Sequence, residues 1–315
     1  MSALNLPQLA ELLGEGAIVE DNVALGRRTT YRVGGDGAVF VTLLTLEAAK
    51  QFASALPEKL RIAVLGNGSN VLVADEGFSG VVVHLAGDFE EIMVEGNAVT
   101  AGGGADLPRV ARRTVEEGLT GFEWAVGVPG TVGGAVAMNA GGHGSSIAES
   151  LQVASVLNLR TGEVTTRAVE GFAFGYRHSN VRSDEVVLRA TFALEPGDRE
   201  AGLEQLRGIV SWRRAHQPGG QNCGSVFINP PTAAAGLLID GCGLSGRRHG
   251  SAGVSDKHAN FIQADPEGRA ADVIALIGEV ASEVEQQTGI SLTTELKLLG
   301  DQPSPLGSMM KLVTP

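Results

Sequence analysis

The sequence contains little cysteine, few aromatic residues and less positive than negative charge. Its two cysteines, Cys223 and Cys242, are too few for a disulfide framework or a cysteine-based zinc site, so no metal site is predicted. We expect both to be reduced, small hydrophobic residues in a cytoplasmic protein. Aromatic residues make up 4% of the chain, which argues against a surface that stacks nucleobases. With 24 basic and 36 acidic residues, the net charge of −12 disfavours binding to nucleic acid or to an anionic membrane.

Long hydrophobic runs are also absent. No stretch of about 18 apolar residues occurs, and residues 1–22 lack a basic segment followed by an apolar run. The sequence therefore predicts neither a membrane-spanning helix nor a signal peptide. Hydrophobic residues still make up 43% of the chain, which is enough for a sizeable core. At roughly 100–200 residues per domain, the 315 residues suggest two domains.

Glycine is abundant, with 44 of 315 residues, about twice the usual proportion of ~7%. Helical periodicity and short strand-like runs are mixed along the chain, which predicts an α+β fold with a domain boundary near residue 200. Helices are expected at 7–13, 46–55, 106–118, 198–215, 232–240 and 269–288. Strands are expected at 38–43, 61–65, 71–74, 80–85, 98–102, 151–158, 163–168, 185–194 and 292–299. The tail after Gly300 contains three prolines and is expected to be loosely held.

Three glycine-rich segments are candidate ligand loops. Residues 29–35 read Thr-Thr-Tyr-Arg-Val-Gly-Gly, residues 66–70 read Gly-Asn-Gly-Ser-Asn after an apolar strand, and residues 127–142 are rich in glycine and alanine. Such turns can direct backbone N–H groups at an anion, because glycine adopts positive φ and has no Cβ in the way. A single loop of this kind is more often a structural turn, but three of them favour a bound diphosphate cofactor. Neither a Rossmann fingerprint nor a P-loop is present.

An ordered set of motifs carries a family resemblance. The motifs are Thr-Tyr-Arg-Val-Gly-Gly at 30–35, Gly-Asn-Gly-Ser-Asn at 66–70, Gly-Val-Pro-Gly-Thr-Val-Gly-Gly-Ala at 127–135, Phe-Gly-Tyr-Arg-x-Ser at 174–179, Gly-Ser-Val-Phe-x-Asn-Pro at 224–230 and Lys-His-Ala-Asn-Phe at 257–261. From Thr29 to about Gly300 the chain resembles the UDP-N-acetylenolpyruvoylglucosamine reductase family. The resemblance implies a flavin-binding domain of the vanillyl-alcohol-oxidase type, made of two subdomains, over residues 1–200 with its core at about 29–196. It implies a C-terminal α+β substrate-binding domain over 201–315.

The resemblance also implies the reaction and its cofactor. Such an enzyme uses NADPH and FAD to reduce the enolpyruvyl group of a UDP-sugar, UDP-N-acetylglucosamine enolpyruvate, to UDP-N-acetylmuramate in peptidoglycan synthesis. FAD is expected to be noncovalent, because Asn67 stands where related oxidases have a flavin-linked histidine. The expected cofactor-binding residues are Tyr31, Arg32, Gly34, Gly66, Asn67, Gly68, Ser69, Asn70, Gly127, Val128, Pro129, Gly130, Thr131, Gly133, Gly134 and Asn139. The oligomeric state is open, with a monomer favoured.

Three residues match the catalytic residues of this family. Arg177 would bind the substrate carboxylate, since a guanidinium donates two parallel hydrogen bonds and stays charged. Ser225 would donate a proton to the α carbon, and Glu295 would assist proton delivery or steady the intermediate. Without the motifs, the commoner readings would be a surface arginine, a Gly-Ser turn and a solvated strand face.

The sequence departs from the family pattern in places. Ile228 and His216 stand where relatives often have lysine, and His216 is a candidate to contact the substrate diphosphate or the nicotinamide ring. Only 48 positions separate Arg177 from Ser225, as in a shorter form that lacks a substrate-covering tyrosine loop, so the residues that hold the UDP group are left open. One alternative function is a flavin oxidoreductase of the same fold acting on a hydroxy acid or alcohol. Another is a flavin- or nucleotide-binding protein without catalysis.

Overall fold

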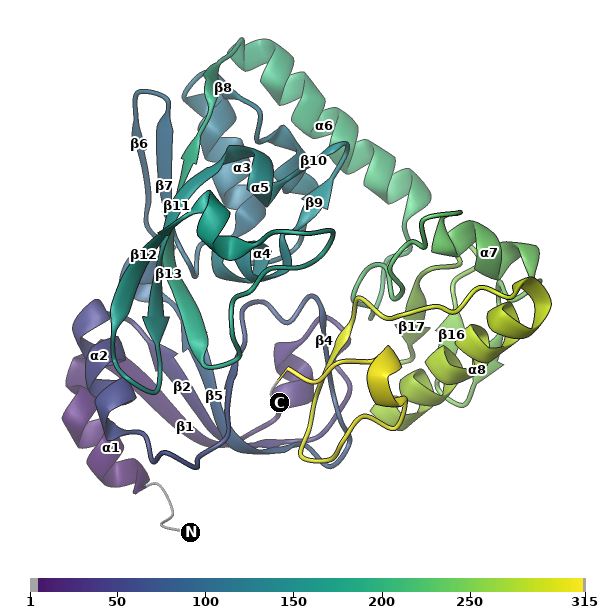
Figure 1. Ribbon diagram of the computed structural model, residues 1–315, viewed down its shortest axis with the longest axis horizontal. Helices are drawn as coiled ribbons and strands as arrows, with labels where there is room; N and C mark the ends of the chain where they lie inside the picture. The colour runs from purple at the N-terminus through teal and green to yellow at the C-terminus, as the bar shows by residue number, and fades with distance from the viewer. Residues whose placement is uncertain (1–4, 314–315) are drawn as a thin grey trace. The chain divides into compact units, whose positions relative to one another are not determined.

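The computed structural model describes residues 5–313, which form two compact units (Figure 1). Unit 1 comprises residues 5–21, Val39–Gly66 and Gly80–Arg213, and unit 2 comprises Asn22–Ala38, Asn67–Ser79 and residues 214–313. This division differs from the single boundary expected near residue 200, because it falls after Arg213 and gives two N-terminal segments to unit 2. Backbone pairing explains the difference, since strand β4 (Val71–Val73) pairs in parallel with β18 (Lys297–Leu299).

Unit 1 holds most of the regular structure. Its helices are α1 (Leu6–Leu13), α2 (Leu46–Ala55), α3 (Leu107–Glu116), α4 (Val132–Met138), α5 (Ile147–Ser150) and α6 (Arg199–His216), whose last turn enters unit 2. Its strands are β1 (Ala17–Val23), β2 (Gly37–Leu43), β3 (Ile62–Val64), β5 (Phe78–Leu85), β6 (Ile92–Glu95), β7 (Ala98–Gly102), β8 (Leu119–Thr120), β9 (Gly141–Gly142), β10 (Ser145–Ser146), β11 (Leu151–Asn158), β12 (Val164–Ala168), β13 (Glu185–Ala193) and β14 (Glu195–Pro196). Short 3-10 helices lie at Gly14–Gly16, Gly87–Glu90, Glu123–Gly127 and Val169–Phe172.

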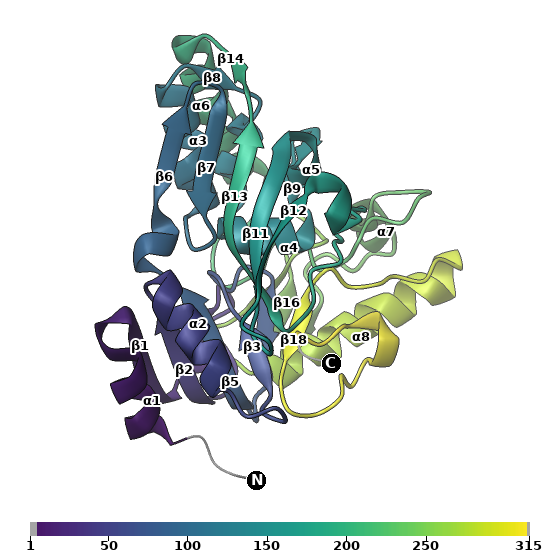
Figure 2. The same cartoon turned by 60° about the vertical axis from the view of Figure 1, so that its left-hand side comes forward.

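Two sheets organise unit 1. The four-stranded sheet has the order β1-β2-β5-β3, and the five-stranded sheet has the antiparallel order β12-β11-β13-β7-β6. Helices α3 and α4 pack against the five-stranded sheet, and α1 lies beside α2 (Figure 2). Val110 of α3, Val136 of α4 and Phe192 of β13 are completely buried in the core between these layers.

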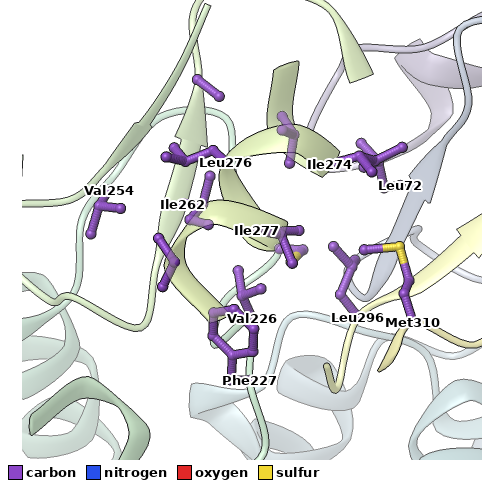
Figure 3. Packing of buried hydrophobic residues seen from close by; sticks show 14 of the residues in the cluster. Leu72, Val226, Phe227, Val254, Ile262, Ile274, Leu276, Ile277, Leu296 and Met310 are labelled. Carbon is purple, nitrogen blue, oxygen red and sulfur yellow. The ribbon is translucent and has the colours of Figure 1, made fainter. Parts of the chain in front are cut away.

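Unit 2 is built around one long helix. Its helices are α7 (Ala235–Gly241) and α8 (Ala270–Thr288), and its strands are β4, β15 (Arg248–His249), β16 (Ala252–Val254), β17 (Ile262–Ala264) and β18. Short 3-10 helices lie at Leu25–Arg28 and Gly307–Met309. Strands β15, β16 and β17 form an antiparallel sheet. Ile274 and Ile277 of α8 belong to the same buried cluster as Leu72, Phe227 and Leu296 (Figure 3). The core therefore joins segments that are more than 200 residues apart in the sequence.

Local sequence signals correctly located many elements. Helix α2 and strand β11 have the expected bounds, and α3 and α6 differ from expectation by two residues or fewer at each end. Thr45 caps α2 by accepting a hydrogen bond from the Ala48 N–H at 3.2 Å. Pro108 occupies the first turn of α3, and Gly118 follows that helix with a φ of +74°. Within residues 5–313, no helix is long and apolar enough to cross a membrane.

Three expectations were wrong or incomplete. No helix was expected in the glycine-rich segment that forms α4. The helix is delimited by Thr131, which caps its start, and by Asn139, which ends it at a φ of +42°. The strand expected at 292–299 is reduced to Lys297–Leu299, because the chain bends at Glu295 and Leu296. The tail is held rather than loose, since the Leu298 N–H donates to the Lys311 carbonyl at 2.9 Å.

Candidate functional site

Ser225 and Glu295 lie on neighbouring backbone segments of unit 2. The Glu295 N–H donates to the Val226 carbonyl at 2.8 Å, and the Ile228 N–H donates to the Thr293 carbonyl at 2.9 Å. These bonds form an antiparallel bridge that aligns the two segments although 70 positions separate Ser225 from Glu295. The structure thus brings two of the three expected catalytic residues together.

Two asparagines hold this pair of segments. Asn260 is 3% exposed, and its side chain accepts from the Phe227 N–H at 2.9 Å and donates to the Phe227 carbonyl at 2.8 Å. Its own carbonyl accepts from the Val226 N–H at 2.8 Å. The Asn70 side chain donates to the Glu295 carbonyl at 3.0 Å. Asn70, which was expected to bind the cofactor, therefore fixes the backbone of Glu295 in this structure.

A cavity of about 360 Å³ opens beside Ser225 within unit 2. Its lining is Ser225, Asn229, Ala234, Gly236, Leu237, Asp240, Ser245, Asp256, Lys257, His258, Ala259 and Asn260. The Lys257 ammonium donates to the Arg214 carbonyl at the end of α6 at 2.6 Å. Burial lowers the pKa of His258, which favours the neutral imidazole. The cavity combines one ammonium, two carboxylates and several neutral hydrogen-bonding groups.

Tyr31 and Cys223 lie in the interior of unit 2. Tyr31 is completely buried, its hydroxyl donates to the Ile262 carbonyl at 3.0 Å, and the Cys223 thiol is a second hydrogen-bond partner. Burial raises the pKa of the Cys223 thiol to about 12, and the negative charge of Glu295 adds to that increase. Cys223 is therefore a neutral, buried thiol, as expected. The burial of Tyr31 favours a packing role over the expected contact with a cofactor.

The first two glycine loops touch each other within unit 2. The Thr30 N–H donates to the Gly68 carbonyl at 3.2 Å. Gly68 has a φ of +61°, and a Cβ there would lie 2.6 Å from the Thr29 Cα. Gly34 has a φ of +109°, and its Cβ would lie 2.2 Å from the Val73 carbonyl oxygen. Close backbone approach and positive φ therefore require glycine at both positions.

The same loops carry the donors that a diphosphate needs. In the part of the chain that the structure describes, the N–H groups of Gly68 and Ser69 have no intramolecular acceptor. Arg32 lies in the first loop, is exposed, and has a φ of +55°. Backbone amides and a guanidinium are the kinds of donor that phosphate oxygens such as those of FAD accept.

The third glycine loop belongs to unit 1 and packs against the end of β3. A Cβ at Gly66 would lie 2.4 Å from the Thr131 Oγ1. The Gly133 N–H donates to the Gly103 carbonyl at 2.8 Å, so this amide is used within the protein. Thr131 is buried, whereas Pro129 and Gly134 are exposed. One side of the loop is thus fixed by packing, and the other is available to a ligand.

Arg177 lies in a tight turn of unit 1. Gly175 and His178 exchange backbone hydrogen bonds of 3.0 and 3.2 Å, which places Tyr176 and Arg177 at the tip. Arg177 has a φ of +53°, and one of its guanidinium nitrogens donates to the Gly141 carbonyl at 2.8 Å. Its guanidinium carbon lies 5.0 Å from the centre of the Tyr176 ring. These contacts hold the side chain, which is half-buried.

Sequence reasoning missed the residues that set this geometry. Asn139 was expected at the flavin, yet its amide donates to the Gly175 carbonyl at 2.9 Å and accepts from the Ala148 N–H at 3.0 Å. Asn260 lies in a recognised motif, but nothing local predicts that it bonds Phe227. His216, whose contact with substrate was an open question, is exposed at the end of α6.

Comparison with known proteins agrees with this picture. The FAD binding domain family model matches residues 41–167, and the model of the UDP-N-acetylenolpyruvoylglucosamine reductase C-terminal domain matches residues 216–299. The chain is 39% identical over 282 residues to UDP-N-acetylenolpyruvoylglucosamine reductase 2 of Symbiobacterium thermophilum, covering 89% of this chain and 91% of that protein. It is 42% identical over 297 residues to the reductase of a Synechococcus species, covering 91% of this chain and 95% of that protein.

A solved structure shows the same likeness. The crystal structure of UDP-N-acetylenolpyruvylglucosamine reductase from Thermus caldophilus superposes with a TM-score of 0.79 at 35% sequence identity. The match covers 90% of this chain and 99% of that one. The expected α+β fold with a flavin-binding domain is thereby confirmed. The chain belongs to the UDP-N-acetylenolpyruvoylglucosamine reductase family.

Proposed function

We propose that this chain reduces the enolpyruvyl group of UDP-N-acetylglucosamine enolpyruvate to give UDP-N-acetylmuramate for peptidoglycan synthesis, with NADPH as reductant. The observation that carries the proposal is the hydrogen bond from the Glu295 N–H to the Val226 carbonyl, which joins the segment that contains Ser225 to the segment that contains Glu295. The alternative of a flavin oxidoreductase acting on a hydroxy acid or alcohol does not account for this pair. The match of residues 216–299 to the reductase C-terminal domain supports the same choice.

The glycine loops are the proposed FAD site. Gly68, Ser69 and Arg32 of unit 2 would hold the diphosphate through N–H groups and a guanidinium. When bound, FAD would supply the redox chemistry, which is hydride transfer between NADPH and the β carbon of the enolpyruvyl group. The remaining task of the protein is to bind the substrate carboxylate and to provide one proton.

Arg177 is the proposed carboxylate-binding residue. Hydride addition to the β carbon moves negative charge through the α carbon onto the carboxylate. A guanidinium opposite that carboxylate stabilises the transition state more than the ground state, because the charge it faces increases. The turn from Gly175 to His178 and the bond to Gly141 limit the positions that the guanidinium adopts.

Ser225 is the proposed proton donor to the α carbon. A serine hydroxyl is a weak acid, so it needs a neighbour that stabilises the alkoxide or returns the proton. Glu295 is the ionisable residue that the backbone bridge places on the adjoining segment. We therefore assign proton resupply to Glu295.

The wider assignments follow from this proposal. We assign residues 1–200 to the FAD-binding domain and 201–315 to the substrate-binding domain, with the segments around β4 contributing to unit 2. We propose a monomer as the active form. Cys223 and Cys242 are free thiols, which fits our placement of the reaction in the cytoplasm.

The test separates the two half-reactions. Substitution Ser225→Ala should leave reduction of the flavin by NADPH near the wild-type rate. Reoxidation by the enolpyruvyl substrate should slow by roughly 10²–10⁴-fold, the usual contribution of a positioned acid. Stopped-flow absorbance of the flavin measures both steps, and its bands report FAD occupancy. Ser54→Ala, an exposed serine on α2, is the matched control. Equal slowing of both half-reactions in Ser225→Ala would refute the assigned role.

A further inference from the structure

We propose that Asn139 is a positioning residue for Arg177, acting through the turn that carries it. This inference rests on the proposed function, because it assumes that Arg177 binds the substrate carboxylate. Asn139 is 7% exposed and ends α4 in the left-handed region, with a φ of +42°. Asparagine adopts this conformation more readily than most residues, and its side chain stays free to bond elsewhere.

The amide of Asn139 joins two segments. Its Nδ2 donates to the Gly175 carbonyl at 2.9 Å, at the base of the Arg177 turn. Its Oδ1 accepts from the Ala148 N–H at 3.0 Å, in α5. Because both ends of the amide bond to backbone groups, the turn is tied to the end of α4 and the start of α5. These two bonds alone account for an amide at position 139, without a contact to the flavin ring.

Two more hydrogen bonds link the same stretch of chain to the same turn. One Arg177 guanidinium nitrogen donates to the Gly141 carbonyl at 2.8 Å, and the Ser179 hydroxyl donates to the Ala137 carbonyl at 2.8 Å. Residues 137–141 thus contact the turn at its base, at Ser179 just after it and at the guanidinium itself. Ser179 is 7% exposed, so this bond is shielded from water.

The consequence for chemistry is geometric. Arg177 occupies a positive φ, which is unfavourable for a residue with a side chain and persists only when the surroundings impose it. The bond from Asn139 to Gly175 supplies part of that constraint. Loss of this bond frees the turn to relax, and a displacement of about 1 Å at a catalytic group can cost about 10²-fold in rate.

Substitution Asn139→Gly tests the proposal. Glycine keeps the left-handed conformation and removes only the amide. In the FAD-loaded enzyme, we expect unchanged flavin occupancy and unchanged reduction by NADPH. Reoxidation by the enolpyruvyl substrate should slow by roughly 10–10²-fold at saturating substrate. Asn180→Ala is the matched control, since Asn180 also donates its amide to a carbonyl, that of Gly171, but at an exposed position.

A double-mutant cycle distinguishes positioning from general destabilisation. Asn139→Gly should cost much less in an Arg177→Lys background than in the wild type, because both changes remove the same arginine geometry. Additive effects would overturn the proposal, as would reoxidation at the wild-type rate or loss of FAD from Asn139→Gly. If that variant fails to fold, Asn139→Asp decides the matter by the same rates and the same cycle, because it keeps the acceptor for the Ala148 N–H and removes the donor to the Gly175 carbonyl. Wild-type enzyme that is not reoxidised by the enolpyruvyl substrate would instead refute the proposed function.

Discussion

Asn260 should contribute more to stability than an ordinary polar residue. Substitution Asn260→Ala leaves the N–H and the carbonyl of Phe227 without their partners, and Phe227 is 1% exposed. Each unsatisfied buried group costs about 1–3 kcal/mol, so the free energy of unfolding should fall by roughly 2–6 kcal/mol. The same bonds fix the backbone of Phe227, which lies between the residues that pair with the Glu295 segment, so turnover should fall as well.

Substitution Asn260→Asp should make this loss depend on pH. One carboxylate oxygen still accepts from the Phe227 N–H, but the other faces the Phe227 carbonyl and repels it. Burial and this repulsion raise the pKa of the new carboxyl above its usual ~3.9. Because the folded state then binds the proton more tightly than the unfolded state, stability should recover as the pH falls towards about 4. It should decline as the pH rises through the folded-state pKa.

Urea unfolding of the FAD-loaded enzyme, followed by far-ultraviolet circular dichroism, measures both effects. Asn180→Ala is the control: the Asn180 amide also donates to a backbone carbonyl, that of Gly171, but in an exposed position. We expect it to lose at most about 1 kcal/mol. A loss below about 1 kcal/mol in Asn260→Ala would show that Phe227 finds other partners and would refute the reasoning.

Two further predictions concern stability alone. Burial acts to raise the pKa of Glu185, but hydrogen bonds, first that from Arg167, outweigh it and lower the pKa from 4.5. Glu185→Gln should therefore cost about 1.5–3 kcal/mol near pH 7, a gap that closes as the pH falls below about 4.5; a pH-independent gap would contradict this. Gly34→Ala should cost roughly 2–4 kcal/mol, because its Cβ would lie 2.2 Å from the Val73 carbonyl oxygen. Gly96→Ala is the control, because Gly96 also has a positive φ but a Cβ there would meet no other atom. Its loss of stability measures the cost of the backbone conformation alone. If both variants lost the same free energy of unfolding, the predicted clash at Gly34 would be refuted.

The sequence by itself determined the family and much of the local structure. Periodicity located α2 and β11, because an amphipathic pattern records which face of an element is buried. Buried and more exposed residues alternate along 292–298 as expected, with Leu292 and Leu296 buried and Glu295 partly exposed. The alternation holds even though most of this segment is not a strand. The motifs pointed to Ser225 and Glu295 as candidates, because proton transfer needs particular residue types and these two stand where the family's motifs have them.

The tertiary structure decided what each polar side chain contacts. Asn70, Asn139 and Asn260 bond to backbone groups 225, 36 and 33 positions away, respectively. The buried position of Tyr31 likewise depends on Ile262, 231 positions along the chain. A hydrogen bond depends on distance and direction in space, whereas a local pattern records only period and propensity. The sequence could therefore propose which residues carry the chemistry, while only the packed chain shows which groups those residues contact.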